Sequence, residues 1–392
     1  MTTNWYTELS DERVFAACNL LIEEIKKKFT VESTPQTGAV PPRSAGKKRG
    51  AKGPLKKRKS PGPVARVVEV LKKQGWPEDG LRERIYPLLW EGIRREFIFI
   101  KPPRQRQLEK EIGYIYGIPA EDRIRIVPVR GPTAISHVSS TGATLVLDLI
   151  KELGRKKDRV HIALGAGSTS RMVARHLAAL IQAEVQCPPL TFHALTSGFL
   201  VEEPAIAPIT FFHFFDEDRF DVKYVGLFSE AVVRCKDYDD VKKAVGVKGS
   251  FELARDIDIV ITSLASRQDP HGLLNQFLEH YRDVDLQDYR AMKDYLEKQG
   301  WCGDVQYLPY SPNGPIPLMR GIRAVTLLEL SELVEMAKSG NKFVVLLSGP
   351  CGQCGQTRTD ALRPLLTSTS LKVWSHLVCD VKTGEELTQR TA

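Results

Sequence analysis

The sequence has no apolar run that approaches the roughly 18–20 residues of a membrane-spanning helix. Its opening residues, MTTNWYTELSDER, are polar and acidic, and they lack the basic and then apolar pattern of a secretory signal. The cysteine count of seven is odd, and five of the cysteines stand far apart, which favours reduced structural thiols over a disulfide framework. These absences predict a cytoplasmic protein with no membrane segment.

The composition also lacks the bias of a disordered or fibrous chain. Of 392 residues, 42% are hydrophobic and 27% are charged, which is ordinary for a folded globular protein. At about 100–200 residues per domain, the length allows two or three folded units. The formal net charge of +8 is confined to one segment, because residues 43–59 hold nine Lys or Arg and no acid.

The sequence divides into four parts: residues 1–30, 31–63, 64–101 and 102–392. In the first part, apolar residues recur at steps of three and four, which predicts an amphipathic helix. The stripe must be buried against either another part of this chain or a second subunit. The sequence does not distinguish these two partners. The stripe consists of Val14, Phe15, Cys18, Leu21, Ile22, Ile25 and Phe29.

Residues 31–63 combine Pro, Gly, Ser and positive charge with almost nothing to bury, which predicts a disordered basic linker. Such a run attracts polyanions through counterion release, so nucleic acid is favoured as its partner over a purely solubilising role. The basic residues predicted to contact DNA here are Lys47, Lys48, Arg49, Lys56, Lys57, Arg58 and Lys59.

Residues 64–101 have the parts of a helix-turn-helix with a wing. A helical run at 64–74 is followed by the breaker GWPEDG, a second helical run at 81–95 and the strand-like FIFIK. In such units the second helix enters the major groove of DNA. A plain helical hairpin is the alternative, and Pro87 is expected to kink the second helix or move its start. Candidate DNA contacts are Arg82, Arg84, Arg94 and Arg95.

From residue 102 onward, short apolar strands alternate with helical runs, which predicts an α/β, Rossmann-like domain whose mostly parallel sheet is covered on both faces. Ligands of such sheets bind at the carboxyl ends of the strands. The predicted strands are Ile124–Val129, Val160–Leu164, Leu190–Leu195, Lys223–Leu227, Ile257–Leu264, Phe343–Leu347 and Val373–Cys379. The predicted helices are Thr141–Leu153, Met172–Ala183, Asp237–Ala244, Leu327–Lys338 and Arg358–Leu366.

The clearest candidate site is the loop LGAGSTSR between one of these strands and a helix. Gly165 and Gly167 allow a tight turn and close approach of a ligand, and the N–H groups of Ser168, Thr169 and Ser170 open a helix that favours an anion. The loop lacks the third glycine of a dinucleotide fingerprint and the Gly-Lys-Ser/Thr of a Walker loop. A plain strand-to-helix turn is the alternative.

Small and hydroxylic residues also follow other predicted strands. Their convergence on one edge of the sheet would suit a polyhydroxylated ligand. The residues singled out are Thr196, Ser197, Gly198, Ser263, Gly303 and Asp304.

The pair Cys351 and Cys354 has the spacing of a metal or redox site. A structural zinc site needs four ligands, yet the chain has no second CxxC, and the nearest histidine in the sequence is His376. The sequence therefore predicts that these thiols hold no metal. No other cofactor is expected.

Several stretches resemble the sugar-binding effector domain of the SorC class of bacterial transcriptional regulators. They are EGIRREFIFIKPPRQRQLEKEIGYIYGI, LGAGSTS, DIDIVITSLAS, the pair Gly303-Asp304 and residues 325–388. The class is related to DeoR-type regulators and, remotely, to ribose-5-phosphate isomerase and glucosamine-6-phosphate deaminase folds. Arg358 falls where the class usually has lysine, and an arginine still offers a cationic fork to a phosphate.

The resemblance implies a homo-oligomer that binds DNA and responds to a sugar or a phosphorylated sugar. We expect a phosphate on the helix that follows Gly167, with Arg358 as a second contact. The alternative is a sugar-phosphate isomerase-like enzyme. It is disfavoured because no Asp, Glu or His follows LGAGSTS in a catalytic arrangement. We therefore expect no enzymatic activity.

Overall fold

The computed structural model describes residues 9–10, 13–14, 16–18, 20–22, 24, 62–76, 81–94, 104–119, 123–184, 186–215, 220–316 and 321–389. The chain forms two compact units, Met1–Ile100 and Lys101–Ala392. The two are described separately below. None of the helices in the described ranges is long and apolar enough to cross a bilayer.

The smaller unit contains α2 (Pro63–Lys73), α3 (Leu81–Arg94) and helical residues between positions 13 and 24. Of the predicted apolar stripe, Val14, Cys18 and Leu21 are buried, and Leu21 packs in a core shared with α2 and α3, so the same chain covers this part of the stripe. The shared core contains Ala17, Leu21, Val67, Leu71, Trp76, Leu81, Ile85 and Leu88. Residues 97–101, where the sequence predicts a strand, lie outside the described residues.

The turn after α2 explains why that helix ends where it does. Gly75 has φ +79°, its N–H donates to the carbonyl of Lys72, and the N–H of Trp76 donates to the carbonyl of Leu71. This paired closure requires a residue that tolerates the left-handed region. Of the two effects predicted for Pro87, a moved helix start is excluded, because α3 runs from Leu81 to Arg94 with the proline inside it.

The larger unit is built on a ten-stranded sheet whose main path is β1-β12-β11-β6-β2-β3-β4, with every pair in that path parallel. The predicted α/β fold with a mostly parallel sheet is confirmed, and each of the seven predicted strands is present within a few residues. Their bounds are β1 (Ile124–Val127), β2 (Val160–Leu164), β3 (Leu190–Ala194), β4 (Val222–Val225), β6 (Ile259–Ser266), β11 (Phe343–Ser348) and β12 (His376–Asp380).

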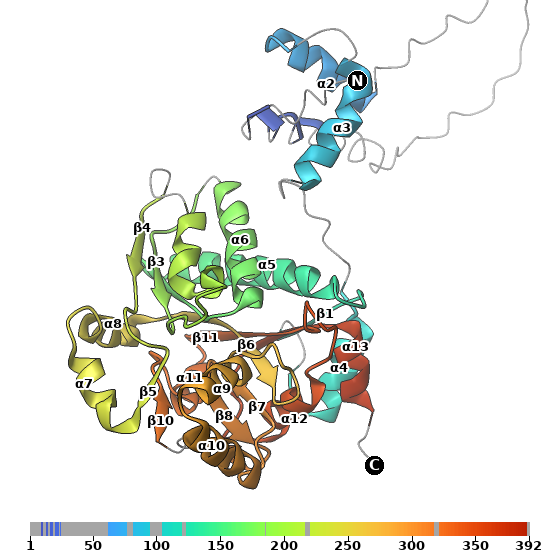
Figure 1. Ribbon diagram of the computed structural model, residues 1–392. Helices are drawn as coiled ribbons and strands as arrows, with labels where there is room; N and C mark the ends of the chain where they lie inside the picture. The colour runs from blue at the N-terminus through green and yellow to red at the C-terminus, as the bar shows by residue number, and fades with distance from the viewer. Residues whose placement is uncertain are drawn as a thin grey trace, which may run out of the picture. The chain divides into compact units, whose positions relative to one another are not determined.

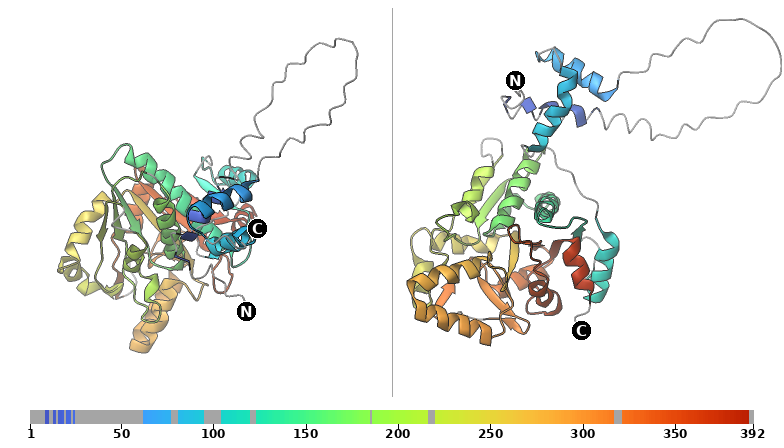
Figure 2. Two further views of the ribbon diagram at one scale, coloured as in Figure 1. Left: turned by 90° about the horizontal axis from the view of Figure 1, so that it is seen from above. Right: turned by 45° about the vertical axis from the view of Figure 1, so that its right-hand side comes forward.

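Helices cover both faces of the sheet (Figures 1 and 2). Along β6, Ile259 and Ile261 pack in the core beneath α5 (Ala134–Gly154) and α6 (Ser168–Gln182), whereas Val260 and Leu264 pack in the core of the opposite face. This alternation follows from the two-residue period of a strand. The opposite face is covered by α4 (Arg106–Ile115), α11 (Leu330–Lys338), α12 (Thr359–Thr367) and α13 (Val381–Thr388).

In the sequence between β6 and β11, the chain forms a hairpin of two helices and an antiparallel extension of the sheet. The sequence patterns did not predict these elements. The helices are α9 (Leu273–Val284) and α10 (Leu286–Lys298), and the extension is β7 (Gly303–Val305), β8 (Leu308–Ser311) and β9 (Gly314–Pro315). The shorter elements are α7 (Tyr238–Lys243), α8 (Lys248–Leu253), η2 (Pro204–Ile206), η3 (Pro208–Phe214), η4 (Cys235–Asp237), η5 (Ala254–Asp256), and the pair β5 (Val232–Arg234) and β10 (Ile322–Ala324).

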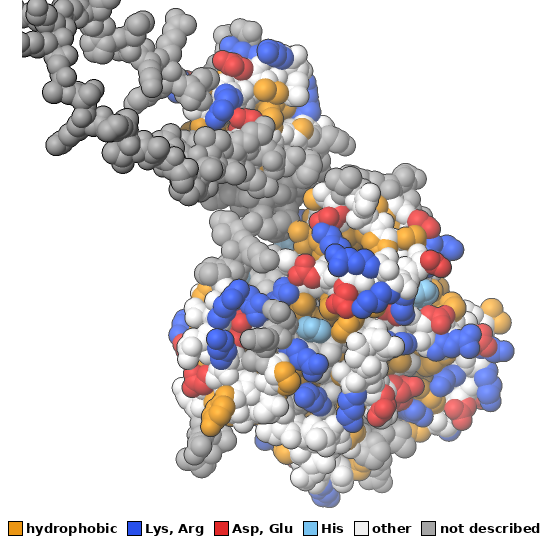
Figure 3. All heavy atoms as spheres, turned by 180° about the vertical axis from the view of Figure 1, so that it is seen from behind, with side chains coloured by type: hydrophobic (Ala, Val, Ile, Leu, Met, Phe, Trp, Pro, Cys, Tyr) orange, Lys and Arg blue, Asp and Glu red, His pale blue; other side chains and the backbone are white. Residues whose placement is uncertain are grey.

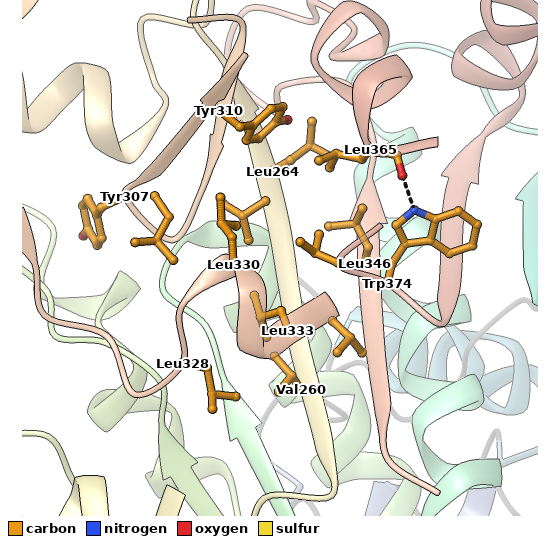
Figure 4. Close-up of a cluster of buried hydrophobic side chains, with 14 of the residues drawn as sticks. Val260, Leu264, Tyr307, Tyr310, Leu328, Leu330, Leu333, Leu346, Leu365 and Trp374 are labelled. Atoms are coloured by element: carbon orange, nitrogen blue, oxygen red, sulfur yellow. Dashed lines mark hydrogen bonds between the residues drawn. The ribbon is translucent and has the colours of Figure 1, made fainter. Parts of the chain in front are cut away.

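The core around β6 and β11 is densely apolar, and a buried indole within it is hydrogen-bonded. Figure 4 shows Val260, Leu264 and Leu346 in this cluster together with Leu330 and Leu333 of α11, and the Trp374 indole N–H donates to the carbonyl of Leu365 at 2.9 Å. Because a buried indole donor needs a partner, this bond fixes the chain entering β12 against α12.

Candidate functional site

A cavity of about 360 Å³ opens at the carboxyl ends of β2, β6 and β11. β2 and β6 are neighbours in the sheet. From β2 the chain continues to β3 on one side, and from β6 it continues toward β11 on the other side, so the strand order reverses between β2 and β6. Open α/β sheets bind their ligands at such a reversal, because the loops on either side diverge there. The volume suits a small molecule of the size of a sugar or sugar phosphate. We call this space the switch-point cavity.

The glycine loop forms one wall of the switch-point cavity. Gly167 has φ +108°, its N–H donates to the carbonyl of Ile206, and its carbonyl accepts the first helical bond of α6 from the N–H of Arg171. The N–H groups of Ser168, Thr169 and Ser170 precede that bond, and no side chain caps the helix. The helix therefore presents its positive end to the cavity.

The need for glycine at position 167 is conformational. A Cβ there would contact only Leu273 Cδ1, at 3.8 Å. However, residues other than glycine rarely adopt a backbone φ of +108°. Gly165 is different, because a Cβ there would lie 2.4 Å from the side-chain nitrogen of Gln306. Gly165 thus makes room for a protein side chain, and it does not line the cavity.

Gln306 is a site residue that the sequence analysis missed. Its Oε1 accepts the N–H of Ala166 at 2.7 Å, and its Nε2 donates to Thr262 Oγ1 at 3.0 Å. Gln306 and Tyr307 form the two-residue turn between β7 and β8 with φ +51° and +65°. Residues other than glycine rarely adopt a positive φ. Strained backbone of this kind is often found at functional sites, and here it lies at the wall of the cavity.

Asp304 lies at the floor of the cavity, beside this turn. Its carboxyl is buried, and its Oδ1 accepts no hydrogen bond from the described residues. Burial raises the pKa of Asp304 to about 7, although a hydrogen bond from the backbone of Tyr307 and the charge of Arg358 act in the opposite direction. Near neutral pH, a carboxyl with this pKa can accept a hydrogen bond from a ligand hydroxyl when it is ionised, or donate one to it when it is protonated.

Arg358 lines the cavity as expected, but its charge is already engaged. Its Nε and Nη2 donate to Asp269 Oδ2 at 3.1 and 2.8 Å, and both side chains are largely buried. Arg358 is the one Lys or Arg among the described residues that line the cavity, which also include the acids Glu203 and Asp304. A phosphate here would therefore depend first on the N–H groups of α6.

Cys351 and Cys354, for which the sequence predicts no further metal ligands, have two ligand-bearing neighbours in space. Cys351 is buried beside the cavity, and its Sγ lies 3.5 Å from His271 Nδ1, while His271 Nδ1 lies 3.6 Å from Asp269 Oδ1. Cys354 is exposed and completes a group of four ligand-bearing residues. The premise that His376 is the nearest histidine is wrong in space, because it compared positions along the chain and not across the strand ends.

Thr196, Ser197 and Gly198 do not join this cavity. They line a separate hollow of about 670 Å³ with Phe199, Phe228 and Phe277 among its other residues. The hydroxyls of Thr196 and Ser197 donate to the carbonyls of Val325 and Leu227. These residues therefore fix the chain after β3, and Thr196, Ser197 and Gly198 do not converge with Ser263 and the glycine loop on one site as expected.

Some of the remaining predicted effector residues line the switch-point cavity, and others are buried in the protein interior. Ser263 lines the switch-point cavity together with Gly167, Ser168 and Thr169. Ser170 and Gly303 are buried and do not line it. A Cβ at Gly303 would lie 2.6 Å from the carbonyl of Ala265, so glycine is needed there for the pairing of β7 with β6.

The structure describes few of the predicted DNA contacts. Arg82 is exposed on α3, and Tyr86, one turn later, is 64% exposed. Arg84 and Arg94 lie within α3, but their side chains are outside the description, as are Arg95 and the linker residues Lys47, Lys48, Arg49, Lys56, Lys57, Arg58 and Lys59. On the face of the larger unit in Figure 3, basic and acidic side chains are interspersed.

Comparisons with known proteins bear on the fold. No protein-family model matches the sequence, and no curated protein matches it. The structure is similar to the full-length sorbitol operon regulator SorC from Klebsiella pneumoniae, at 14% identity and a TM-score of 0.56, over 83% of this chain and 98% of that one.

Two further structures are similar over 72% of this chain. One is a domain of a possible sugar-binding transcriptional regulator from Arthrobacter aurescens TC1, at 15% identity, 97% coverage of that chain and a TM-score of 0.52. The other is a putative SorC family transcriptional regulator from Enterococcus faecalis, at 17% identity, 100% coverage and a TM-score of 0.51. At these identities the likeness establishes the fold.

Proposed function

We propose that this protein is a cytoplasmic, sugar-responsive transcriptional regulator. The observation that supports this most strongly is the switch-point cavity, which lies at the carboxyl ends of β2, β6 and β11 in a fold shared with structures described as sugar-binding regulators. The cavity combines an uncapped helix N-terminus with Ser168, Thr169, Ser263 and Gln306, a set of groups that suits a polyhydroxylated anion.

In this proposal the smaller unit binds DNA. α2 and α3 share one apolar core, and α3 exposes Arg82 and Tyr86 on the side away from that core. The basic segment 43–59 adds nine positive charges that attract the phosphate backbone. We further propose a homo-oligomer, since regulators with such units read paired half-sites as dimers.

The test uses the full chain. Duplexes with a random central segment are selected for binding, and the enriched duplex is titrated in the presence of a panel of sugars and their phosphates. We expect an enriched sequence and a change in affinity of about 5–150-fold with one sugar, the range of typical allosteric coupling. Absence of DNA binding at low salt would refute the proposal.

One specific observation supports the second candidate function, a sugar-phosphate isomerase-like enzyme. The structure brings Asp304 and His271 to the same cavity as the glycine loop, although both lie about 100 residues or more beyond that loop in the sequence. A buried carboxyl with a pKa of about 7 is well placed for proton transfer near neutral pH.

Incubation with aldose and ketose phosphates, followed by NMR, distinguishes the two functions. Turnover that is abolished in the Asp304→Asn variant would establish the enzyme. A regulator would show binding of the sugar without turnover.

A further inference from the structure

Four side chains with metal-binding atoms meet beside the switch-point cavity, and two of them, His271 and Cys351, line it. Asp269 and His271 come from the segment between β6 and α9, and Cys351 and Cys354 come from the segment between β11 and α12. Their ligand atoms all lie within 4.8 Å of one another. Two segments about 80 residues apart in the sequence therefore supply one carboxylate, one imidazole and two thiols to the same point.

Two of the distances within this group agree with those of a tetrahedral metal site, and the group as a whole lies within 4.8 Å. Zinc holds thiolate sulfur at about 2.3 Å and imidazole nitrogen or carboxylate oxygen at about 2.0–2.2 Å. At tetrahedral angles, these lengths put sulfur and nitrogen about 3.6 Å apart, and nitrogen and oxygen about 3.4 Å apart. The structure has 3.5 Å between Cys351 Sγ and His271 Nδ1 and 3.6 Å between His271 Nδ1 and Asp269 Oδ1.

The two thiols are held in one tight turn of the backbone. The N–H of Cys351 donates to the carbonyl of Gln356 at 2.9 Å. Gly355, directly after the second thiol, has φ +72°, and its N–H donates to the carbonyl of Cys351 at 2.8 Å. These contacts turn the CGQCG segment tightly, so that both thiols belong to one compact loop.

The carboxylate ligand has an outer partner, and the site has a route to solvent. Arg358 holds Oδ2 of Asp269, which leaves Oδ1 facing His271. Ligating carboxylates and imidazoles are commonly oriented by partners of this kind. Cys351 and Asp269 are buried, whereas Cys354 is exposed, so an ion can reach the four ligands from the side of Cys354.

We propose that Asp269, His271, Cys351 and Cys354 bind one zinc ion that ties the β6–α9 segment to the β11–α12 segment. Two thiolates with an imidazole and a carboxylate form a donor set that suits zinc. This proposal replaces the sequence-based prediction of no metal, which considered only ligands that are close in sequence. It depends neither on DNA binding nor on the nature of the effector.

The experiment measures metal directly on the full chain, purified under reducing conditions without chelators. Elemental analysis is expected to find one zinc per chain. After removal of the zinc, titration with Co²⁺ is expected to give the visible absorption bands of a tetrahedral site and a thiolate charge-transfer band. The variants Cys351→Ser, Cys354→Ser and His271→Gln should each bind zinc more than 100-fold more weakly, since loss of a ligand should exceed the 10–100-fold effect of losing an outer partner.

Matched controls and a positioning variant sharpen the result. Cys187→Ser and His280→Gln remove a thiol and an imidazole outside the cluster, and both should retain wild-type zinc affinity. Arg358→Gln should weaken zinc binding by about 10–100-fold while leaving the stoichiometry at one.

Two results would overturn the proposal. One is a reduced wild-type chain that binds neither Zn²⁺ nor Co²⁺ stoichiometrically. The contact between Cys351 and His271 would then be a hydrogen bond between a thiol and an imidazole. The other is unchanged zinc affinity in the cysteine variants.

Discussion

Arg358 and Asp269 form a forked ion pair at the edge of the switch-point cavity, with Nε and Nη2 of the arginine donating to the same carboxylate oxygen at 3.1 and 2.8 Å. The Asp269 side chain is 2% exposed and that of Arg358 is 11% exposed. The arginine therefore neutralises a buried acid of this chain before any ligand arrives. A phosphorylated effector would have to share this guanidinium with Asp269.

Removal of one partner of this pair should destabilise the protein strongly. We expect Arg358→Met to lower the free energy of unfolding by about 3–5 kcal/mol, because it leaves a buried carboxylate without its cation. The double variant Arg358→Met/Asp269→Asn should recover most of that loss. Urea denaturation with chelator present isolates the ion pair from any metal. Equal losses in the single and double variants would contradict this explanation.

Stability should depend on pH through Asp304. Its folded-state pKa is about 7, above the usual 3.8, because burial disfavours the charged form. Between these values the folded state retains a proton that the unfolded state has released, so the contribution of Asp304 to stability falls as pH rises, by about 1.4 kcal/mol per pH unit. The advantage of Asp304→Asn over wild type should thus grow across this window and level off above it. A pH-independent difference would show that the pKa is not raised.

Gly165 and Gln306 should be energetically coupled. A Cβ at position 165 would lie 2.4 Å from the side-chain amide of Gln306, so Gly165→Ala should cost about 1–3 kcal/mol through overpacking. In a Gln306→Ala background the same change should cost clearly less, because the clashing group is gone. A double-mutant cycle by chemical denaturation measures the coupling. Additive losses would mean that the glycine serves another purpose.

The N-terminus of α6 should recognise a phosphate. No acid occupies its first turn, so Ser168→Asp should stabilise the helix by about 0.3–1 kcal/mol and also repel a bound phosphate. Titration calorimetry should show at least tenfold weaker binding of a phosphorylated sugar and little change for its unphosphorylated form. Ser136→Asp, in the first turn of α5, is the matched control. Equal affinities for the two sugars in wild type would remove the phosphate from the proposed site.

Arg82 should contribute to DNA sequence preference, and the basic segment should contribute to overall affinity. Deletion of residues 43–59 should weaken all duplexes similarly and flatten the salt dependence, by about 0.9 in the slope of log K against log salt for each DNA phosphate that the segment neutralises. Arg82→Ala should instead reduce the discrimination between enriched and random duplexes. Arg171→Ala, an exposed arginine of the larger unit, serves as the control.

The sequence predicted the parallel sheet well because each main-path strand is a short apolar run between helical segments, and that pattern is local. It did not predict α9, α10 or the β7–β8 hairpin. The Gln306–Tyr307 turn has no glycine or asparagine to mark it, although both residues have positive φ. The glycine loop was found from its own residues. The proximity of Asp269, His271 and Cys351 was missed because parallel strands bring distant loops together at one edge of the sheet, which spacing along the chain does not encode.

Strand β1 sits at one edge of the sheet, and its partner is β12, with Ile124 opposite Leu377 and Val127 opposite Asp380. About 250 residues separate these partners, so the loop that must close is among the longest this unit can form, and such pairing slows folding. During synthesis β1 leaves the ribosome long before β12 exists. Its apolar side chains and unpaired backbone remain exposed until nearly the whole unit has been synthesised, which favours aggregation of the nascent chain at this strand.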